Sequence, residues 1–374
     1  MRQGRVATIQ ECFADVEDPR ESNRWHLLID ILVIAICAAI CGADNWVEVA
    51  QYGKAKADWL GQFLVLPHGI PAHDTFGRVF ARIDPQQFQR GFRTWVQRVH
   101  ELAGREVIAV DGKQLRRSHD RALGKRALYM VSAWAVESRV VLGQWAVDRK
   151  SNEITAIPEL LKLLTVRDCI VTVDALNCQQ DIATTVIDHG GDYVMAVKEN
   201  QGELYHTLET LFAPEERQWV ACAHAQTRNK DHGRVEYRDC WITDDPMYRE
   251  YIAEHTEWTG LQSLIMVKTV RQTPEERSVV RRYFISSLPP DAQRALETIR
   301  SHWHIENRLH WVLDIAFRED ESRVRKGYGA ENFAVLRHLA LNLLKHEETA
   351  KCGTHAKRLK AAWDHDYLLK VLGA

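Results

Sequence analysis

Three carboxylates in this sequence stand at positions where they could bind a metal ion together. Asp111 follows the apolar run EVIAV, and Asp174 follows the apolar run CIVTV. Both runs are short and rich in β-branched residues, which predicts two strands that each end at the aspartate. In open α/β sheets, ligands bind beyond the carboxyl ends of the strands. We therefore expect Asp111 and Asp174 to lie at the same edge of a sheet.

The third carboxylate, Glu306, lies within the segment HWHIENRLHWVLDIAFRED, which predicts one continuous helix. Residues four apart are neighbours on a helix, so Glu306 shares a stripe with His302 and His310. Apolar residues close to this stripe predict that it faces protein: Trp303, Ile305 and Leu309. A glutamate in such surroundings needs a partner, and we expect Glu306 to be buried because it completes a metal site.

The residue types favour a hard cation. Adjacent carboxylates repel each other and are costly to desolvate unless a cation joins them. Ligand sets made only of oxygen favour Mg²⁺ or Mn²⁺. Zinc is not expected, because the sequence has no H-E-x-x-H motif, so three histidines are assigned to packing or substrate contacts: His302, His304 and His310. Each aspartate could instead be an ordinary turn residue, and Glu306 could pair with Arg300 or Arg308 on its own helix.

The elements that must position these residues follow from the hydrophobic periodicity. After Gly104 the predicted order is strand, strand, strand, helix, strand, helix, strand. In this order the first and fourth strands can lie side by side, which would bring Asp111 and Asp174 together. Between 203 and 290 three further segments are predicted as strands: GRVEYRDCWIT, LIMVKTVRQ and SVVRRYFISSL.

The chain divides into three predicted parts. Residues 1–104 have helical periodicity throughout, which predicts an all-helical N-terminal domain. Residues 105–345 are predicted to form the α/β catalytic domain, with a β-rich insertion at about 203–290. Residues 346–374 are expected to be a C-terminal tail, since the last 25 residues are weakly patterned.

Composition excludes few classes of protein. The formal net charge of −2 gives no global sign of a polyanionic partner, so any such argument must be local. The eight cysteines include no C-x-x-C pair, which favours reduced thiols in a cytosol. The apolar run from Ile31 to Cys41 is too short to span a bilayer, and no targeting segment is predicted. We expect a cytoplasmic protein without a membrane partner.

Several segments carry a resemblance to a known family. The segments IAVDGKQLRRS, VTVDALNCQQDIA, YVMAVKENQ and HGRVEYR, and the long stretch around Glu306, resemble those of DDE transposases, within the H-repeat-associated (ISAs-type) insertion sequences of bacteria. The resemblance covers nearly the whole chain. It implies a ribonuclease-H-like core, and Asp111, Asp174 and Glu306 as the catalytic triad that holds two Mg²⁺ or Mn²⁺ ions. It also implies double-stranded DNA as partner, a homodimer or higher assembly on DNA, and a nucleoid-associated bacterial location. By the same resemblance, the N-terminal domain 1–104 is expected to serve in DNA end binding or dimerisation.

The chain departs from the family pattern around the glutamate. Many related transposases carry a Tyr, an Arg and a Lys at fixed spacings from it, where this sequence has Ile299, His302 and Leu313. We expect His302 to replace the arginine as a contact to DNA phosphate.

Local basic stretches predict the DNA contacts. Lys113, Arg116 and Arg117 follow Asp111 closely, and a basic run beside a metal site favours a phosphate backbone as substrate. Alternatively, this basic stretch could be an ordinary loop exposed to solvent. Further predicted contacts lie after the fifth strand, in the insertion and near the glutamate: Lys198, Asn200, Gln201, His232, Arg234, His302, Arg323 and Arg325.

These residues predict a transposase that cleaves DNA strands and transfers them at the ends of an insertion sequence. Two bound ions suit the in-line displacement of phosphodiesters. Two alternatives remain open from the sequence: an inactive or repurposed DNA-binding protein derived from a transposase, and a nuclease or phosphatase built on a similar sheet.

Overall fold

Nine strands form one sheet in the computed structural model, which describes residues 9–22, 24–99, 106–119, 124, 126–147, 152–231 and 234–373. The strand order is β3-β2-β1-β4-β5-β9-β8-β7-β6. At its centre, β1 (Val107–Gln114) pairs in parallel with β4 (Ile170–Val173), and β4 pairs in parallel with β5 (Asp192–Val197). An antiparallel hairpin of β2 (Tyr129–Ala135) and β3 (Val140–Val147) extends the sheet beyond β1. The predicted neighbourhood of the first and fourth strands is confirmed.

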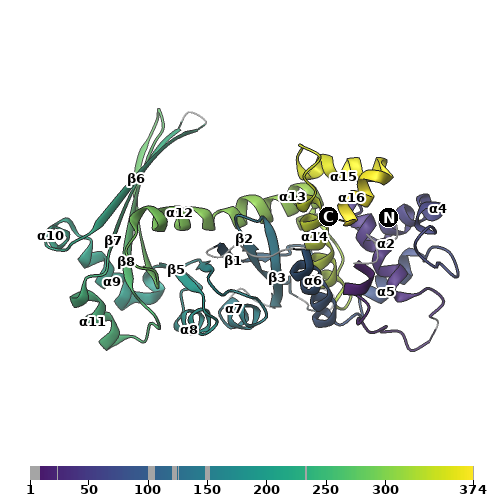
Figure 1. Cartoon of the computed structure of the whole chain (residues 1–374), viewed down its shortest axis with the longest axis horizontal. Coiled ribbons are helices and arrows are strands. Elements are labelled where there is room, and N and C mark those ends of the chain that lie inside the picture. Colours follow the sequence, from purple (N-terminus) through teal and green to yellow (C-terminus); the bar gives the residue numbers. More distant parts are fainter. Residues whose placement is uncertain are drawn as a thin grey trace.

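Helices cover both faces of the central strands. Helix α7 (Glu153–Lys162) connects β3 to β4, and α8 (Gln180–Asp188) connects β4 to β5, so the predicted element order is confirmed. Figure 1 shows α7 and α8 on one face of the sheet and α12 (Ala292–His302) crossing the other. All four residues of β4 are buried, as expected for a parallel strand covered on both faces.

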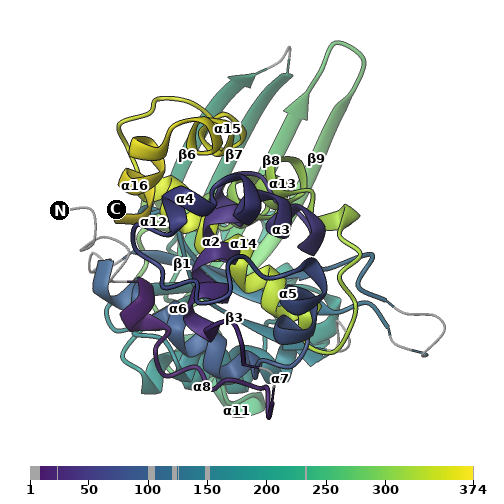
Figure 2. The same ribbon diagram turned by 90° about the vertical axis from the view of Figure 1, so that its right-hand side faces the viewer.

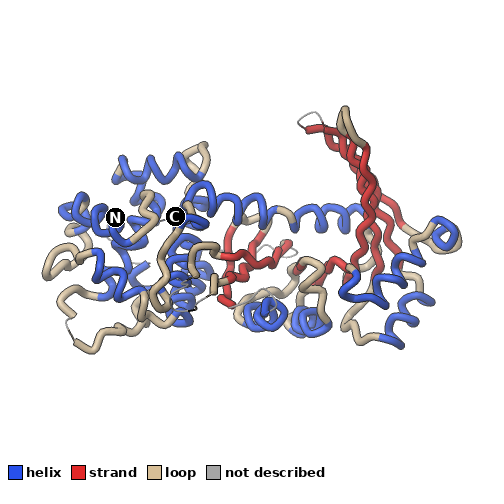
Figure 3. The backbone as a smooth tube through the Cα atoms, turned by 180° about the vertical axis from the view of Figure 1, so that it is seen from behind, coloured by secondary structure: helices blue, strands red, loops and turns tan. Residues whose placement is uncertain are grey.

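The predicted insertion belongs to the same sheet. It contains β6 (Ala223–Asp231), β7 (Arg234–Thr243), β8 (Ser263–Gln272) and β9 (Arg277–Ser286), each antiparallel to its neighbour. Strand β9 joins β5, so the insertion continues the core sheet. The ends of these strands project from the molecule as a twisted arm (Figure 3). Strand β6 was not predicted, because its sequence AHAQTRNKD has few apolar residues.

Helices also accompany the strands of the insertion. Their bounds are α9 (Gly202–Leu211), α10 (Pro214–Arg217) and α11 (Pro246–His255). The description of the insertion as β-rich therefore covers only part of it.

The N-terminal helices pack around one long helix from near the other end of the chain. Helix α14 (Gly329–His346) is buried over most of its length and contacts both α2 (Leu28–Ile40) and α6 (Pro85–Val99). Figure 2 shows α14 running among these helices. The other helices of this group are α3 (Trp46–Ala55), α4 (Ala57–Leu60) and α5 (His73–Phe80). In the described part of the chain, no helix combines the length and apolar character needed to cross a membrane.

The last 25 residues are mostly helical, although the sequence predicted a weakly patterned tail. Helix α15 (Thr354–Trp363) contacts α2 and α14, and α16 (His365–Gly373) contacts α14. The buried Arg358 guanidinium donates to the carbonyl of Ala39 at 2.9 Å and also to the carbonyl of Ala316. The C-terminal helices are therefore part of the folded core.

Candidate active site

The two aspartates leave the sheet side by side. Val110 of β1 pairs with Val173 of β4, and Asp111 and Asp174 are the next residues of these two parallel strands. The prediction that β1 ends at Asp111 is wrong, because β1 continues to Gln114, paired only with β2. Since β4 stops at Val173, Asp111 lies where β1 loses its parallel neighbour. This end of two parallel strands is the expected place for a ligand.

Local hydrogen bonds orient Asp174. Its Oδ1 accepts from the backbone N–H of Asn177 at 3.1 Å and from the Asn177 side-chain amide at 2.9 Å. This is a turn in which an aspartate caps the backbone three residues later. Asn177 is fully buried, so its amide has little freedom to move. The Asp174 carboxylate is thereby held in one orientation.

A fourth carboxylate, which the sequence analysis missed, lies beneath the two aspartates. Glu153 stands in the first turn of α7 and is 1% exposed. Its Oε2 accepts from the side-chain amide of Asn177 at 3.2 Å. Its Oε1 would lie 2.2 Å from a Cβ added at Gly112, so the residue after Asp111 must be a glycine unless Glu153 moves. The only sequence signal was an acidic residue in a first helical turn, where helix-dipole effects commonly place one.

Burial, together with crowded negative charge, changes the protonation of Asp111. Burial raises the pKa of Asp111 to about 7, and the charge of Asp174 is the next cause in the same direction. The carboxylates of Glu153 and Glu306 also raise this pKa, while the backbone N–H of Gly112 lowers it. An aspartate with such a raised pKa beside other carboxylates is typical of functional sites.

Glu306 lies on a π-helical segment, where a continuous helix was predicted. The π-helix Ile305–His310 separates α12 from α13 (Trp311–Phe317). Turns of this kind are rare and often occur at functional sites, because the wider turn reorients the side chains. Partial desolvation and the charge of Asp174 both raise the pKa of Glu306, so this carboxylate lies within electrostatic range of Asp174.

The prediction that Glu306 is buried is wrong, because its side chain is exposed to solvent. Ile305 and Leu309 of the same segment are fully buried, whereas Trp303 is 44% exposed. The apolar neighbours therefore face the protein, and Glu306 faces the open side of the site. An exposed position leaves its carboxylate accessible to a ligand from solvent.

Two histidines flank the carboxylates. Burial lowers the pKa of His302 to about 4 and that of His310 to about 3, so both imidazoles are neutral at pH 7. His302 Nδ1 lies 3.0 Å from the Thr172 hydroxyl, and His310 Nδ1 lies 3.7 Å from Asp111 Oδ2. A phosphate contact from a neutral His302 would be a hydrogen bond and not an ion pair.

The donor chemistry of the site fits a hard divalent cation, whose ligands are oxygens. The charge of Asp174 raises the pKa of both Asp111 and Glu306, and a cation placed among these carboxylates would relieve this repulsion. Within the described residues, however, no three His, Cys, Asp or Glu side chains gather closely enough to hold an ion. The three carboxylates therefore suit a divalent cation by residue type and by charge. To bind one ion together, their side chains would have to move closer to one another.

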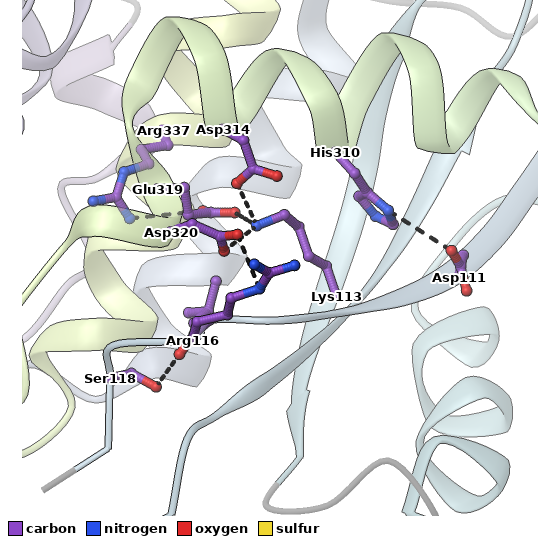
Figure 4. A network of polar contacts seen from close by, with 10 residues as sticks. Asp111, Lys113, Arg116, Ser118, His310, Asp314, Glu319, Asp320 and Arg337 are labelled. Atoms are coloured by element: carbon purple, nitrogen blue, oxygen red, sulfur yellow. Dashed lines mark hydrogen bonds and ion pairs between the residues drawn. The ribbon is translucent and has the colours of Figure 1, made fainter.

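Lys113 ties the β1 strand to the segment that follows Glu306 (Figure 4). Its Nζ lies 2.7 Å from Asp314, 3.1 Å from Glu319 and 3.1 Å from Asp320, and its side chain is only 12% exposed. Although burial lowers the pKa of Lys113, the charge of Glu319 and its neighbours raises it overall. The buried Glu319 also pairs with Arg337 at 3.6 Å. Lys113 is thus engaged by protein carboxylates.

The basic residues after Lys113 are more accessible. Arg116 is 74% exposed and lies 3.1 Å from Asp320, and Arg117 is exposed. Arg325 donates from Nε to the Arg117 carbonyl at 2.9 Å, and Arg323 is exposed nearby in the chain. The structure thus brings two of the predicted basic segments together.

The residues predicted after the fifth strand lie beside the loop that follows Asp174. Asn200 donates from its side chain to the Ala175 carbonyl at 2.8 Å, and Gln201 donates to the Cys178 carbonyl at 2.8 Å. Lys198 is exposed. Of the two predicted contacts in the insertion, Arg234 is exposed at the start of β7, and His232 lies outside the described residues.

Comparisons with known proteins find relatives over almost the whole chain. The family described as Transposase DDE domain matches residues 102–343, and the DDE_Tnp_1-associated family matches residues 10–96. "Putative transposase YncI" of Escherichia coli O157:H7 is 41% identical over 373 residues, which cover 99% of this chain and 95% of that protein. "H repeat-associated putative transposase YhhI" of Escherichia coli K12 is 40% identical over 351 residues, covering 93% and 92%.

A solved structure, the piggyBac transposase synaptic complex with hairpin DNA, superposes with a TM-score of 0.41 at 11% identity, covering 95% of this chain and 75% of that one. This score is too low to support an argument about the chain. The family match and the strand order together confirm the predicted α/β fold with a ribonuclease-H-like core.

Proposed function

Since this chain belongs to the DDE transposase family, we propose that it cleaves and joins DNA strands at the ends of an insertion sequence, in a reaction that requires divalent metal ions. The observation that carries the proposal is the pair of aspartates directly after the last residues that β1 and β4 pair in parallel, with Glu306 within electrostatic range. The raised pKa of Asp111, about 7, supports a site built to receive positive charge.

The residues that would hold the ions are Asp111, Asp174 and Glu306. When bound, a pair of Mg²⁺ or Mn²⁺ ions supplies activation of the attacking hydroxyl and stabilisation of the leaving oxygen in an in-line displacement. Because Asp111 has a pKa of about 7, it gives up a proton when positive charge arrives. Asn177 keeps the Asp174 carboxylate in place during this change, through the two hydrogen bonds that it donates.

The substrate in this proposal is double-stranded DNA, both at the element's ends and at the target. The exposed Arg116, Arg117 and Arg323 lie on segments close to the site and would bind phosphates. We propose that Lys198, which is also exposed, contacts the same backbone. A homodimer or larger assembly on DNA, with the N-terminal helices binding ends or joining protomers, completes the proposal, in a nucleoid-associated cytoplasmic protein.

The Glu306→Gln variant tests the function. This change keeps the shape of the side chain and removes its charge, and because Glu306 is exposed, folding stability should change by no more than about 0.5 kcal/mol. We expect the variant to bind element-end DNA but neither to nick it nor to transfer strands in Mg²⁺.

Glu297→Gln provides the matched control. Glu297 is exposed on α12, so the same substitution is made close by and outside the triad. Cleavage by Glu306→Gln at the level of this control would overturn the assignment of the triad.

A further inference from the structure

A groove rich in arginine lies between the strands of the insertion and the helix that leads to Glu306. It has a volume of about 460 Å³ and is lined by residues of β7, β8 and β9 on one side and by residues of α12 and the π-helix on the other. Its charged lining consists of five arginines and one glutamate: Arg234, Arg238, Arg271, Arg282, Arg300 and Glu236. We call it the arginine groove. The groove carries an excess of positive charge, and none of the three carboxylates of the candidate active site lines it.

Glu236 organises three of these arginines. Its carboxylate lies 2.9 Å from Arg271 Nε and 3.2 Å from Arg234 Nε, and it also pairs with Arg238. Burial raises the pKa of Glu236, but the three arginines outweigh this effect and lower it. One carboxylate therefore fixes three guanidinium groups in place without neutralising them. Such preorganised guanidinium groups suit the recognition of phosphate.

The other two arginines of the groove form no close ion pair among the described residues. In the part of the chain that the structure describes, no carboxylate lies within 4 Å of the guanidinium groups of Arg282 and Arg300, and both residues are exposed. Burial lowers the pKa of Arg300, and the charge of Arg238 adds to this effect and outweighs the opposing charges of Glu236 and Glu297. An anionic ligand would relieve that repulsion.

An aromatic platform stands at the rim. Trp303 lines the groove and is 44% exposed, and the Arg282 guanidinium lies 5.5 Å from the centre of its ring. Asn307, one turn later, lines the groove as well. Glu306 directly precedes Asn307 on the same π-helical segment. The groove and the candidate active site are therefore bordered by neighbouring residues of this segment.

We propose that the arginine groove binds a single strand of nucleic acid, with phosphates on the arginines and a base stacked on Trp303. Arginines that follow a backbone, interleaved with an exposed aromatic ring, form the usual surface for unpaired strands. A duplex would satisfy the arginines but not Trp303, because its bases are stacked on one another inside the helix. This inference rests on the proposed function. It assumes that the DNA substrate has one strand separated from its partner next to Glu306, and it places that strand in the arginine groove.

Binding of a fluorescently labelled oligodeoxythymidylate, followed by anisotropy in EDTA, tests the groove without any catalysis. We expect Trp303→Leu to weaken binding about tenfold without changing its salt dependence, since base stacking carries no charge. Trp303→Phe should restore most of the affinity. Trp311→Leu is the matched control, because Trp311 is 61% exposed on the following helix and does not line the groove.

The arginines have a separate readout. Arg282→Ala and Arg300→Ala should each lower the slope of log K against log salt by about 0.7, the value for one phosphate of a single strand. Arg167→Ala, at an exposed arginine outside the groove, should leave the slope unchanged. On an oligonucleotide without bases, the wild type and Trp303→Leu should bind equally well.

Three outcomes would overturn the inference. Unchanged affinity of Trp303→Leu would remove the stacked base, and an equal loss on the abasic strand would show that Trp303 acts through folding. An equal loss on duplex DNA would make the groove a duplex surface. None of these results depends on cleavage, whereas the Glu306→Gln assay depends on cleavage alone, so either proposal can fail while the other stands.

Discussion

The amino group of Lys113 lies 2.7 Å from the carboxylate of Asp314, and this contact joins the strand that carries Asp111 to the helix that follows Glu306. Asp314 is one of three carboxylates around the same amino group. Lys113 was predicted to contact DNA, and the structure offers it a second role in fixing two parts of the site relative to each other. The two roles predict different behaviour of variants.

Replacement of Lys113 by methionine should destabilise the protein by about 3 kcal/mol, because it leaves three carboxylates crowded without their shared cation. The measurement is urea unfolding of the variant and the wild type at pH 7. Arg116→Ala serves as control, since the 74% exposed Arg116 pairs with Asp320 in solvent and should cost at most about 1 kcal/mol. If Lys113→Met unfolds like this control and instead lowers the salt slope of DNA binding, the DNA contact is its main role.

The raised pKa of Asp111 predicts how its removal changes stability with pH. In the folded protein this carboxyl keeps a proton up to about pH 7, whereas its ordinary pKa is 3.8. The folded state therefore binds more protons between these values, so this group lowers stability as pH rises through that window. At pH 8 in EDTA, Asp111→Asn should be more stable than wild type by a few kcal/mol, up to about 4, at 1.36 kcal/mol for each pH unit.

Thermal unfolding of both proteins in EDTA from pH 4 to pH 8 measures this difference. The difference in stability between Asp111→Asn and the wild type should be small near pH 4 and should grow until about pH 7. A stability difference that stays constant from pH 4 to pH 8 would mean that Asp111 is already ionised at low pH. That result would contradict the raised pKa of Asp111.

Binding of Mn²⁺, measured by calorimetry, should require both aspartates. Asp111→Asn and Asp174→Asn each remove one charge from the same group of carboxylates, and we expect each to reduce affinity at least tenfold. Asp181→Asn changes an exposed aspartate on α8 and should bind like the wild type. Undiminished binding in both aspartate variants would place the ion elsewhere.

Gly112→Ala should disturb the site through Glu153. The added methyl would lie 2.2 Å from the buried Glu153 carboxylate, which must then give up its contact with Asn177 or shift the strand. We expect a loss of 1–3 kcal/mol, roughly the cost of overpacking a well-filled interior. Adding Glu153→Ala removes the obstacle, so the double variant should recover part of the loss. Purely additive effects in this double-mutant cycle would show that the two residues do not interact.

The sequence predicted the sheet and its two aspartates because the signals were local and strong. The runs before Asp111 and Asp174 are apolar and β-branched, and the alternation of strands and helices predicted that the first and fourth strands can lie side by side. Glu153 gave no such signal, because an acid in a first helical turn is common. Its importance depends on the close approach of Gly112, which only the folded chain shows.

The surroundings of Glu306 were predicted less well, for a physical reason. Periodicity correctly indicated that Ile305 and Leu309 face the protein. It assumes a regular helix, however, and the π-helix rotates later residues relative to earlier ones, which removes Glu306 from the buried face. Periodicity also says nothing about which helices cover a surface, so Trp303 was expected inside and lies at the rim of the groove.

The packing of α2 against α14 and α15 has a consequence for the order of synthesis. Helix α2 is almost entirely apolar and buried, and it leaves the ribosome long before the two helices that cover it. Arg358, which binds the carbonyl at the end of α2, is made near the end of translation. For most of its synthesis the nascent chain therefore presents an apolar helix that lacks these two covering helices. Products of premature termination would keep that helix exposed and would be expected to aggregate or to be degraded.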